Sequence, residues 1–338
     1  MNITIKDIAK RANVSITTVS RVINNQDGIG SDTRRKILEI IEEVGYRPNS
    51  IARSMVTKQT KTIGLIIPDV RNPFFPELVR GVEDIVNQSN YSVFLYNTDG
   101  NESKELESLR LIKEKKVDGI VYMCTYGKAN RKFQDVVSQS DIPVVLLDRG
   151  LDNKMFHGVY VNNEKAGYIA TKHLIDLHHN KIGCITGPDH IMNSKERLNG
   201  YLKALTESEI KVDKNLIVPG DYQMEGGYIA AKELLVQEKV TAIFALNDLM
   251  AFGVYQAATE LGVRIPDDLS VVGFDNLKYN KLLNPKLTTI DQLAYQMGEV
   301  AAKMLLRQIN KGRDIVQHSI YLEPELIVRN STKENTIC

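Results

Sequence analysis

From residue 62 onward, short runs of Val, Ile and Leu alternate with longer amphipathic stretches, and this alternation restricts the possible folds more than any other feature. The apolar runs predict strands over residues 62–67, 91–96, 119–123, 143–148, 181–186, 241–246 and 269–274. The stretches between them predict helices over residues 76–88, 103–115, 164–177, 195–207, 226–237 and 248–261. Continuous apolar strands separated by helices are typical of buried parallel sheets.

We therefore predict an α/β fold with two doubly wound parallel-sheet lobes, roughly over residues 61–160 and 161–290, and a closing segment over 291–330. The first 60 residues are different. They carry ten Lys or Arg and six Asp or Glu, a net charge of +4, in a chain whose total formal charge is +1. A basic head on a faintly acidic body is what a polyanion-binding module joined to another domain would look like. We place the head and its hinge at 1–60 and the core at 61–338.

Three short helices are predicted in the head. Thr4 caps the first, whose apolar residues recur at i, i+3, i+4 and i+7, and Ser15 caps the second after a tight connection. A third helix follows Ser31 and stops at Gly45. Two short helices joined by a turn of about three residues, the second exposing small polar groups and an Arg, form a helix-turn-helix.

Polar and aromatic side chains follow the predicted strands of the core. Ligands of open parallel sheets bind at the carboxyl ends of the strands, and two lobes place two such edges across a cleft. Carboxylates and Arg pair with adjacent hydroxyls, amides bind other hydroxyls, and an aromatic face packs on ring C–H groups, so this mixture fits a sugar. Singly, each feature also fits an ion pair, a core residue or a helix cap. The strand-end groups lie at residues 69–75, at Asp148 and Arg149, in the segment leading to Arg197, at Asn247 and Asp248, at Asp275, and at Asp291 and Gln292.

Other chemistries find no support in the sequence. There is no GxSxG, no GxGxxG after a strand and no GxxxxGK[ST], and Cys124, Cys184 and Cys338 lack zinc-ligand spacing. His178 and His179, at a helix end, are interpreted as a solvated pair. We predict no enzyme, no cofactor and no metal site. No apolar run approaches the ~20 residues of a membrane helix, and the N-terminus is unlike a signal peptide, so we expect a cytoplasmic protein.

The head segments TIKDIAKRANVSITTVSRVIN and SDTRRKILEIIEEVGYRPNSIARSM resemble the DNA-binding head and hinge of LacI-family transcriptional repressors, and the resemblance continues to about residue 330. It implies that three residues read base edges in the major groove. An Arg can donate two hydrogen bonds to guanine, a Thr hydroxyl can bond either kind of base, and an Ile can contact a thymine methyl. The implied base readers are Ile16, Thr17 and Arg21, and the residues better placed for phosphate are Ser15, Thr18, Ser20 and Asn24.

The same resemblance implies a hinge over residues 48–55, including Ser50 and Ala52, that becomes helical only on the operator. A segment this short is not a stable helix alone, because nucleation costs more than one or two turns return. Met55 stands where the family has a Leu that wedges into the minor groove. Because Met is apolar and of similar volume, we expect the wedge to persist.

In the core, NPFF, LLDRG, KERLNG, LNDLMAFG, VVGFDN and TTIDQ resemble ribose-binding periplasmic proteins and the ribose repressors of the LacI family. The resemblance implies ribose contacts from ten residues, and one of them, Tyr222, stands where Phe is usual. The ten are Asn72, Phe74, Phe75, Asp148, Arg149, Arg197, Tyr222, Asn247, Asp275 and Gln292. It implies a homodimer that represses a sugar-utilisation operon and is released from double-stranded operator DNA by a small sugar, with ribose as the first candidate. The tail NSTKENTIC has no heptads, which favours a dimer over a coiled-coil tetramer. Alternatives are a LacI-type regulator of another sugar, a corepressor-dependent regulator, and a sugar receptor without DNA affinity.

The predicted role of Arg21 can be tested by Arg21→Ala. The substitution should cost about 1 to 3 kcal/mol of specific binding and relax the base preference, because the bidentate contact to one base pair is lost. The measurement is operator affinity against affinity for random DNA at one salt concentration. An equal loss on both DNAs would contradict a base-reading role.

Overall fold

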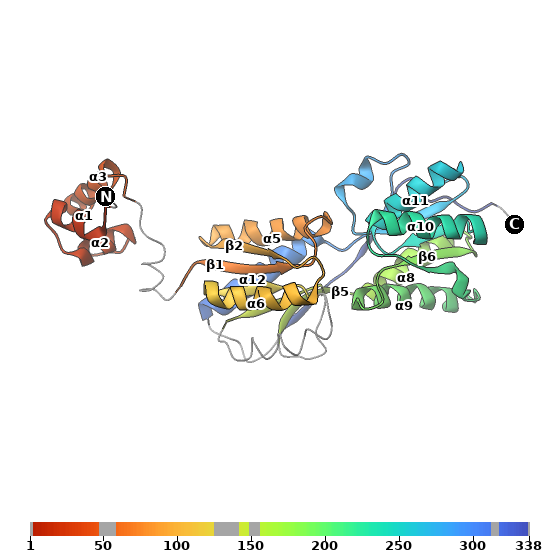
Figure 1. The fold of residues 1–338 in the computed structure, drawn as a ribbon, viewed down its shortest axis with the longest axis horizontal. Coiled ribbons are helices and arrows are strands. Elements are labelled where there is room, and N and C mark those ends of the chain that lie inside the picture. Colours follow the sequence, from red (N-terminus) through yellow and green to blue (C-terminus); the bar gives the residue numbers. More distant parts are fainter. Residues whose placement is uncertain (1–2, 47–58, 125–141, 149–155, 312–317, 337–338) are drawn as a thin grey trace. The chain divides into compact units, whose positions relative to one another are not determined.

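The computed structural model describes residues 3–46, 59–124, 142–148, 156–311 and 318–336. The chain divides into two compact units, residues 1–60 and 61–338. Figure 1 shows both, and each is described by itself. Among the described residues, no helix is both long and apolar enough to cross a membrane.

The first unit is a three-helix head built on a small apolar core. Its helices are α1 (Ile5–Ala12), α2 (Ile16–Ile23) and α3 (Ser31–Glu43). The cap predictions are confirmed for the first two helices: Thr4 and Ser15 are the N-caps, and Ser15 Oγ accepts from the Thr18 amide at 3.0 Å. The third helix begins at Ser31 itself, with Gly30 as its N-cap, one residue earlier than predicted. The helices enclose Ile8, Ala9, Ala12, Val19, Val22 and Ile37.

The second unit contains two six-stranded sheets, which confirms the predicted pair of α/β lobes. The first sheet has the order β11-β5-β4-β3-β1-β2 and is parallel throughout. Its strands are β1 (Thr62–Ile67), β2 (Ser92–Asn97), β3 (Gly119–Tyr122), β4 (Val144–Leu147), β5 (His157–Val161) and β11 (Ser319–Leu322). Helices α5 (Phe74–Gln88) and α12 (Ala294–Lys311) contribute to the core on one face, and α6 (Glu102–Lys115) to the core on the other.

The second sheet has the order β12-β10-β9-β8-β6-β7 and is parallel except for the edge strand β12. Its strands are β6 (Ile182–Thr186), β7 (Ile217–Pro219), β8 (Ala242–Ala245), β9 (Ser270–Phe274), β10 (Thr288–Asp291) and β12 (Glu325–Ile327). Figure 1 shows α10 (Met224–Glu233) and α11 (Asp248–Leu261) on one side of this sheet, and α8 (Asn163–Asp176) and α9 (Met192–Glu207) on the other. Three short helical turns complete the lobe: η1 (Lys214–Leu216), η2 (Leu234–Glu238) and η3 (Lys278–Lys281).

The residues expected to form only a closing segment belong to both lobes. Helix α12 carries Met297, Ala301 and Leu305 into the core of the first lobe, and β11 extends the first sheet beside β5. Strands β10 and β12 belong instead to the second sheet. The lobes are therefore built from interleaved parts of the chain rather than from two consecutive halves.

Glycines set the spacing of three helix pairs in the core. A Cβ on Gly81 of α5 would lie 2.1 Å from the Tyr295 carbonyl oxygen of α12, and a Cβ on Gly200 of α9 would lie 2.1 Å from the Glu164 carbonyl oxygen of α8. At the third pair, a Cβ on Gly227 of α10 would lie 2.3 Å from the Met250 carbonyl oxygen of α11. In each pair the helix backbones approach more closely than any side chain allows.

The last described residues form a strap across the second lobe, which we define as residues 329–335. The Ser331 carbonyl accepts from the Val271 amide at 2.8 Å, and Ser331 Oγ accepts from the Thr288 amide at 2.7 Å. Farther along, the Lys333 carbonyl lies 3.0 Å from the imidazole of His179. His179 is buried, so the interpretation of His178 and His179 as a solvated pair is wrong for His179. The strap is thus held by β9, β10 and the end of α8.

The close helix pairs at Gly81, Gly200 and Gly227, which we call the glycine crossings, predict that adding a methyl group at one of these glycines destabilises the core. Gly200→Ala should lower the free energy of unfolding of the core by about 1 to 3 kcal/mol, because backbone rather than a movable side chain opposes the new methyl group. Asn199→Ala, at the neighbouring exposed position on α9, is the control and should change it by less than about 0.5 kcal/mol. Urea unfolding of both variants measures the difference. Equal stabilities would show that the helices can separate freely.

Candidate functional site

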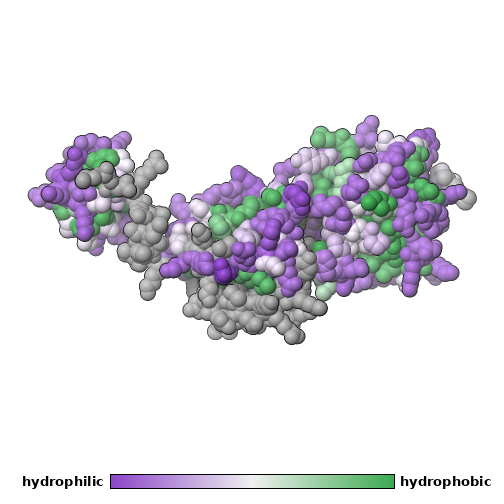
Figure 2. All heavy atoms as spheres, viewed as in Figure 1, coloured by the Kyte–Doolittle hydropathy of each residue, from purple (hydrophilic) through white to green (hydrophobic). Residues whose placement is uncertain are grey.

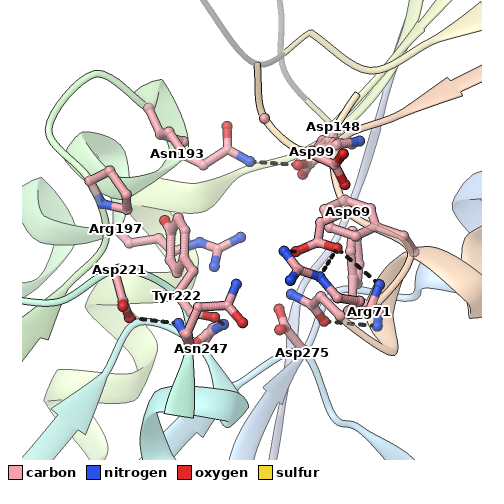
Figure 3. A pocket seen from close by; sticks show the side chains of 18 of the residues that line it. Asp69, Arg71, Asp99, Asp148, Asn193, Arg197, Asp221, Tyr222, Asn247 and Asp275 are labelled. Atoms are coloured by element: carbon pink, nitrogen blue, oxygen red, sulfur yellow. Dashed lines mark hydrogen bonds and ion pairs between the residues drawn. The ribbon is translucent and has the colours of Figure 1, made fainter. Parts of the chain in front are cut away.

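A cavity of about 260 Å³ lies between the two lobes of the core. Figure 3 shows its walls, with side chains from the first and second lobes facing each other. Of the ten predicted ligand residues, nine are described and all nine line the cavity: Asn72, Phe74, Phe75, Asp148, Arg197, Tyr222, Asn247, Asp275 and Gln292. Arg149 lies outside the described residues.

The turn after β1 supplies the aromatic part of the first-lobe wall. Asn72 Oδ1 accepts from the Phe74 amide at 3.0 Å and so fixes the start of α5. The rings of Phe74 and Phe75 meet edge to face, with centroids 5.2 Å apart. Asp69 and Arg71 of the same turn also line this wall. The Arg71 guanidinium donates two hydrogen bonds to the Asp69 carboxylate, at 2.9 and 3.0 Å. The wall offers ring faces beside a paired Arg and carboxylate.

Polar contacts join the lobes directly. Asn193 Nδ2, near the start of α9, donates to Asp148 Oδ2 at 2.8 Å, and Figure 3 shows this bond running from one wall of the cavity to the other. Both residues are buried. On α5, Glu77 Oε2 lies 2.8 Å from Lys278 Nζ of η3. The described form of the core therefore has its lobes in direct contact.

Arg197 is held rigidly in the second-lobe wall. Its guanidinium lies 3.6 Å from the centroid of the Phe274 ring and donates to Asn163 Oδ1 at 2.8 Å and to the Leu246 carbonyl at 2.7 Å. The contact of Nη2 with Gln292 Oε1 is long, at 3.5 Å. Because this nitrogen has the weakest partner, it is the donor that a ligand oxygen could best use.

Asp275 is a buried carboxylate at the end of β9. Its Oδ1 accepts from Gln292 Nε2 at 2.6 Å. Burial is the main reason that its pKa lies well above the usual range; Asp248 and Asp148 raise it further, whereas Arg197 and the bond from Gln292 lower it. The neighbouring Asp248, fully buried behind the site, also has a raised pKa, about 6, mainly because of burial. A hydroxyl donor from a ligand would stabilise the ionised form of Asp275.

Asn247 and Tyr222 are linked on the second-lobe wall. Asn247 Oδ1 caps α11 by accepting from the Met250 amide at 2.9 Å, and its Nδ2 donates to the Tyr222 carbonyl at 3.0 Å. Tyr222 has a φ of 65°, and a Cβ on Gly187 would lie 2.2 Å from its ring. Because Gly187 has no side chain, the Tyr222 ring can lie against its backbone. Asn247 connects the start of α11 to the Tyr222 backbone and so stabilises this wall of the cavity.

Several cavity residues were not among the predicted contacts. Asp69 and Arg71 were among the predicted strand-end groups but not among the predicted contacts. Asp99 lies in the turn after β2, where the strand-end rule could have found it, and Asn193 lies in the segment leading to Arg197. Asp221 follows β7, a three-residue strand that is too short to detect by pattern. The remaining lining residues are Pro68, Gly100, Pro188, His190, Ile191 and Gln223.

The predicted base readers of the head are all on its surface. Ile16 is 44% exposed although apolar, and Thr17 and Arg21 are exposed on the same helix, α2. Within the described head, Arg21 makes no ion pair, whereas Arg11 and Arg35 do. Figure 2 shows hydrophilic side chains over most of the visible face of the head. An exposed Ile beside a free Arg favours a contact surface over a solvated face.

The predicted phosphate contacts are engaged within α2. Ser15 Oγ lies 2.8 Å from Thr18 Oγ1, and Asn24 Nδ2 donates to the Ser20 carbonyl at 2.9 Å. Each hydroxyl keeps further bonding capacity. The hinge residues Ser50, Ala52 and Met55 lie outside the described residues, so their predicted roles stay predictions. Among the described residues, no group of three or more His, Cys, Asp or Glu is arranged to hold a metal.

Comparison with protein families gives two matches. The family described as "Bacterial regulatory proteins, lacI family" matches residues 4–49, and the one described as "Periplasmic binding proteins and sugar binding domain of LacI family" matches residues 60–322. Together they span the head and most of the core.

Two curated relatives are similar over nearly the whole chain. Catabolite control protein A of Priestia megaterium is 40% identical, covering 98% of this chain and 100% of the relative. The HTH-type transcriptional repressor PurR of Photobacterium profundum is 38% identical, covering 98% of this chain and 99% of the relative. The matched family is described as regulatory proteins and the second relative as a transcriptional repressor, which confirms the prediction that the chain is not an enzyme. Neither is described as a ribose repressor, so that finer resemblance stays a prediction.

Two solved structures are also similar. One is the lac repressor dimer bound to operator and the anti-inducer ONPF, with a TM-score of 0.88, 25% identity and coverage of 98% of this chain and 100% of that chain. The other is a LacI family transcriptional regulator from Enterococcus faecium with bound ribose, with a TM-score of 0.74, 31% identity and coverage of 81% and 100%.

Replacing the buried Asp275 carboxyl by an uncharged amide should stabilise the folded protein, and the size of this effect should depend on pH. Because its pKa is raised in the folded state, the folded protein binds its proton more readily than the unfolded chain, and its contribution to stability falls as pH rises. Asp275→Asn should therefore raise the melting temperature by about 3 °C at the upper end of the pH range, and this gain should shrink as the pH is lowered, because protonation of the wild-type carboxyl removes the difference between the two proteins. Thermal melts of both proteins from pH 5 to pH 8 measure it.

Asp268→Asn is the matched control, because the exposed Asp268 pairs with Arg264 and its pKa is lowered to about 2, mainly by that hydrogen bond. This control should show no gain at pH 8. A gain of equal size in both variants would contradict the assignment to burial.

Proposed function

Since the chain belongs to the LacI family of bacterial regulatory proteins, we propose that it represses a sugar-utilisation operon and is released from its operator by a small sugar, D-ribose in the first instance. The cavity between the lobes is the observation that carries this proposal. Its walls combine carboxylates, amides, a fixed Arg and aromatic rings, which is the donor, acceptor and ring-face set that a polyhydroxylated ring needs.

The charge of the cavity favours an uncharged ligand. Five of its described lining residues are Asp and two are Arg, and one of the Arg residues, Arg71, is already paired with Asp69. A phosphate group would meet several buried or half-buried carboxylates, which costs more than the remaining Arg contact returns. A free sugar, in contrast, can donate hydroxyls to these carboxylates. The proposal is therefore for an unphosphorylated sugar.

Ribose is the first candidate because of the similarity to the Enterococcus faecium regulator with bound ribose. Tyr222 adds a hydroxyl where the resembling proteins have Phe, which leaves scope for a related sugar. The relatives PurR and catabolite control protein A are not named for ribose, which favours the alternative of a LacI-type regulator with another effector. The other alternative is a regulator whose ligand strengthens DNA binding. The sign of the response separates these two functions.

The proposed response is a two-state linkage within a homodimer. A ligand that binds one core conformation more tightly shifts the population toward it, and DNA affinity changes by at most that difference in affinity. A homodimer is supported by the similarity to the lac repressor dimer bound to operator. Two heads would then read the two halves of a palindromic operator.

The test is a titration of D-ribose against full-length protein bound to a fluorescent operator, with L-ribose as the stereochemical control. We expect D-ribose to weaken binding at least about tenfold and L-ribose to leave it unchanged. Asp275→Asn should lose the response while keeping operator affinity without ligand, and Asp268→Asn should keep both. If D-ribose leaves binding unchanged, ribose is excluded as the inducer. If it strengthens binding, the corepressor alternative is correct.

A further inference from the structure

Two ligand-facing residues of the cavity floor are carried by turns with unusual backbone. Asp275 has a φ of 120°, and Asn276 and Leu293 have φ values of 55° and 58°. Asp275 precedes Asn276 directly after β9, and Gln292 precedes Leu293 directly after β10. Non-glycine residues in the left-handed region cost free energy and persist only where their surroundings hold them. Something outside the cavity must therefore hold both turns.

Asn276 bridges the two turns. Its Nδ2 donates to Asp291 Oδ2 at 2.8 Å, and Asp291 Oδ1 in turn accepts from the Leu293 amide at 2.7 Å. Asn276 is absent from the cavity that contains Asp275 and Gln292. The side chain therefore ties the turn after β9 to the turn after β10 from behind, and the 2.6 Å bond between Gln292 and Asp275 joins the same turns at the front.

Arg329, the first residue of the strap, holds Asn276. Its Nη2 donates to Asn276 Oδ1 at 2.5 Å, its Nη1 donates to the Leu287 carbonyl at 2.7 Å, and its amide donates to Thr288 Oγ1 at 2.9 Å. The residue is half-buried, so its guanidinium is screened less than a surface charge. The Asn276 side chain is therefore held at both ends, by Asp291 at Nδ2 and by Arg329 at Oδ1.

We propose that Arg329 and Asn276 are positioning residues for the effector: they fix the separation and direction of Asp275 and Gln292, and the strap thereby sets ligand affinity without touching ligand. This inference rests on the proposed function for the identity of the ligand. The hydrogen bonds from Arg329 to Asn276 and from Asn276 to Asp291, which we call the bracing, are present in the protein without ligand. The segment after residue 328 is then part of the effector-binding machinery.

The test is a double-mutant cycle of Arg329→Lys, Asn276→Gly and both together in the full-length protein. Lys keeps a donor for the Leu287 carbonyl, and Gly accepts the left-handed backbone of position 276. Isothermal titration with D-ribose should show each single variant weakening binding about tenfold, and the double variant weakening it no more than either single one. Operator affinity without sugar should stay within about twofold of wild type in all three.

Arg264→Lys is the matched control, because Arg264 makes a two-bond pair with Asp268 in the same lobe, away from the cavity. It should leave D-ribose affinity unchanged. If Arg329 acts only by holding the strap in place, the losses in the two single variants will be independent and will multiply in the double variant. That result, or unchanged affinity in the single variants, would overturn the proposal.

A second measurement does not depend on ligand identity. Hydrogen exchange of the free protein should be faster for the Leu277 and Leu293 amides in Arg329→Lys than in wild type, with exchange in the head and in β1 unchanged. If wild type binds no D-ribose, the proposed effector is wrong, and this exchange measurement alone decides the inference. Unchanged exchange in both turns would refute the bracing even if D-ribose binds.

Discussion

The candidate site depends on backbone that is held in the left-handed region where strands of the core end. Asp148, Tyr222 and Asp275 have φ values of 59°, 65° and 120°, and each places a side chain in the cavity. Such conformations cost of order 1–3 kcal/mol each in non-glycine residues. They turn the chain sharply after a strand, which directs the side chain across the strand ends instead of along the strand. The geometry of the cavity therefore rests on bonds formed behind it.

The second requirement of the site is electrostatic. Asp148 and Asp275 are buried beside Arg197, and Asp248 is fully buried just behind them. Asp248 is stabilised by donors from the Thr289 hydroxyl, the Leu277 amide and Asn280 Nδ2, at 2.6 to 2.8 Å. Asp275 has fewer donors and a pKa raised further by its neighbours. Asp248, behind the site, thus has its hydrogen-bond donors within the protein, whereas Asp275, which lines the cavity, would gain a donor from a hydroxylated ligand.

The sequence predicted the architecture well because buried parallel strands are continuous apolar runs. β1, β6 and β9 lie within one residue of their predicted bounds. β7 was missed because three residues carry no periodicity, and α12 was missed because residues after 290 were considered only as a closing segment. The strand-end rule led to Asn72, Asp148 and Asp275, since proximity there follows from topology.

The rest of the site could not be predicted, because it depends on contacts between distant segments. Asn193 meets Asp148 only because the lobes close on each other, and Arg329 reaches Asn276 across 53 positions of sequence. Hydropathy patterns are local in sequence, so they cannot indicate which residues from distant segments will form such pairs. The identity of the effector is likewise beyond the pattern, because the strand-end rule places polar groups around the cavity but does not say which sugar they bind.

The interleaved construction of the lobes has a mechanical consequence. The chain passes between them three times: after β5, between β10 and α12, and between β11 and β12. A single connection would let the two lobes rotate freely relative to each other. Three connections restrict twisting and sliding of one lobe against the other. The glycine crossings make each lobe stiff, so bending must concentrate in these short connections. The cleft should therefore open and close mainly by rotation of the two lobes about a hinge axis that runs through these three connections.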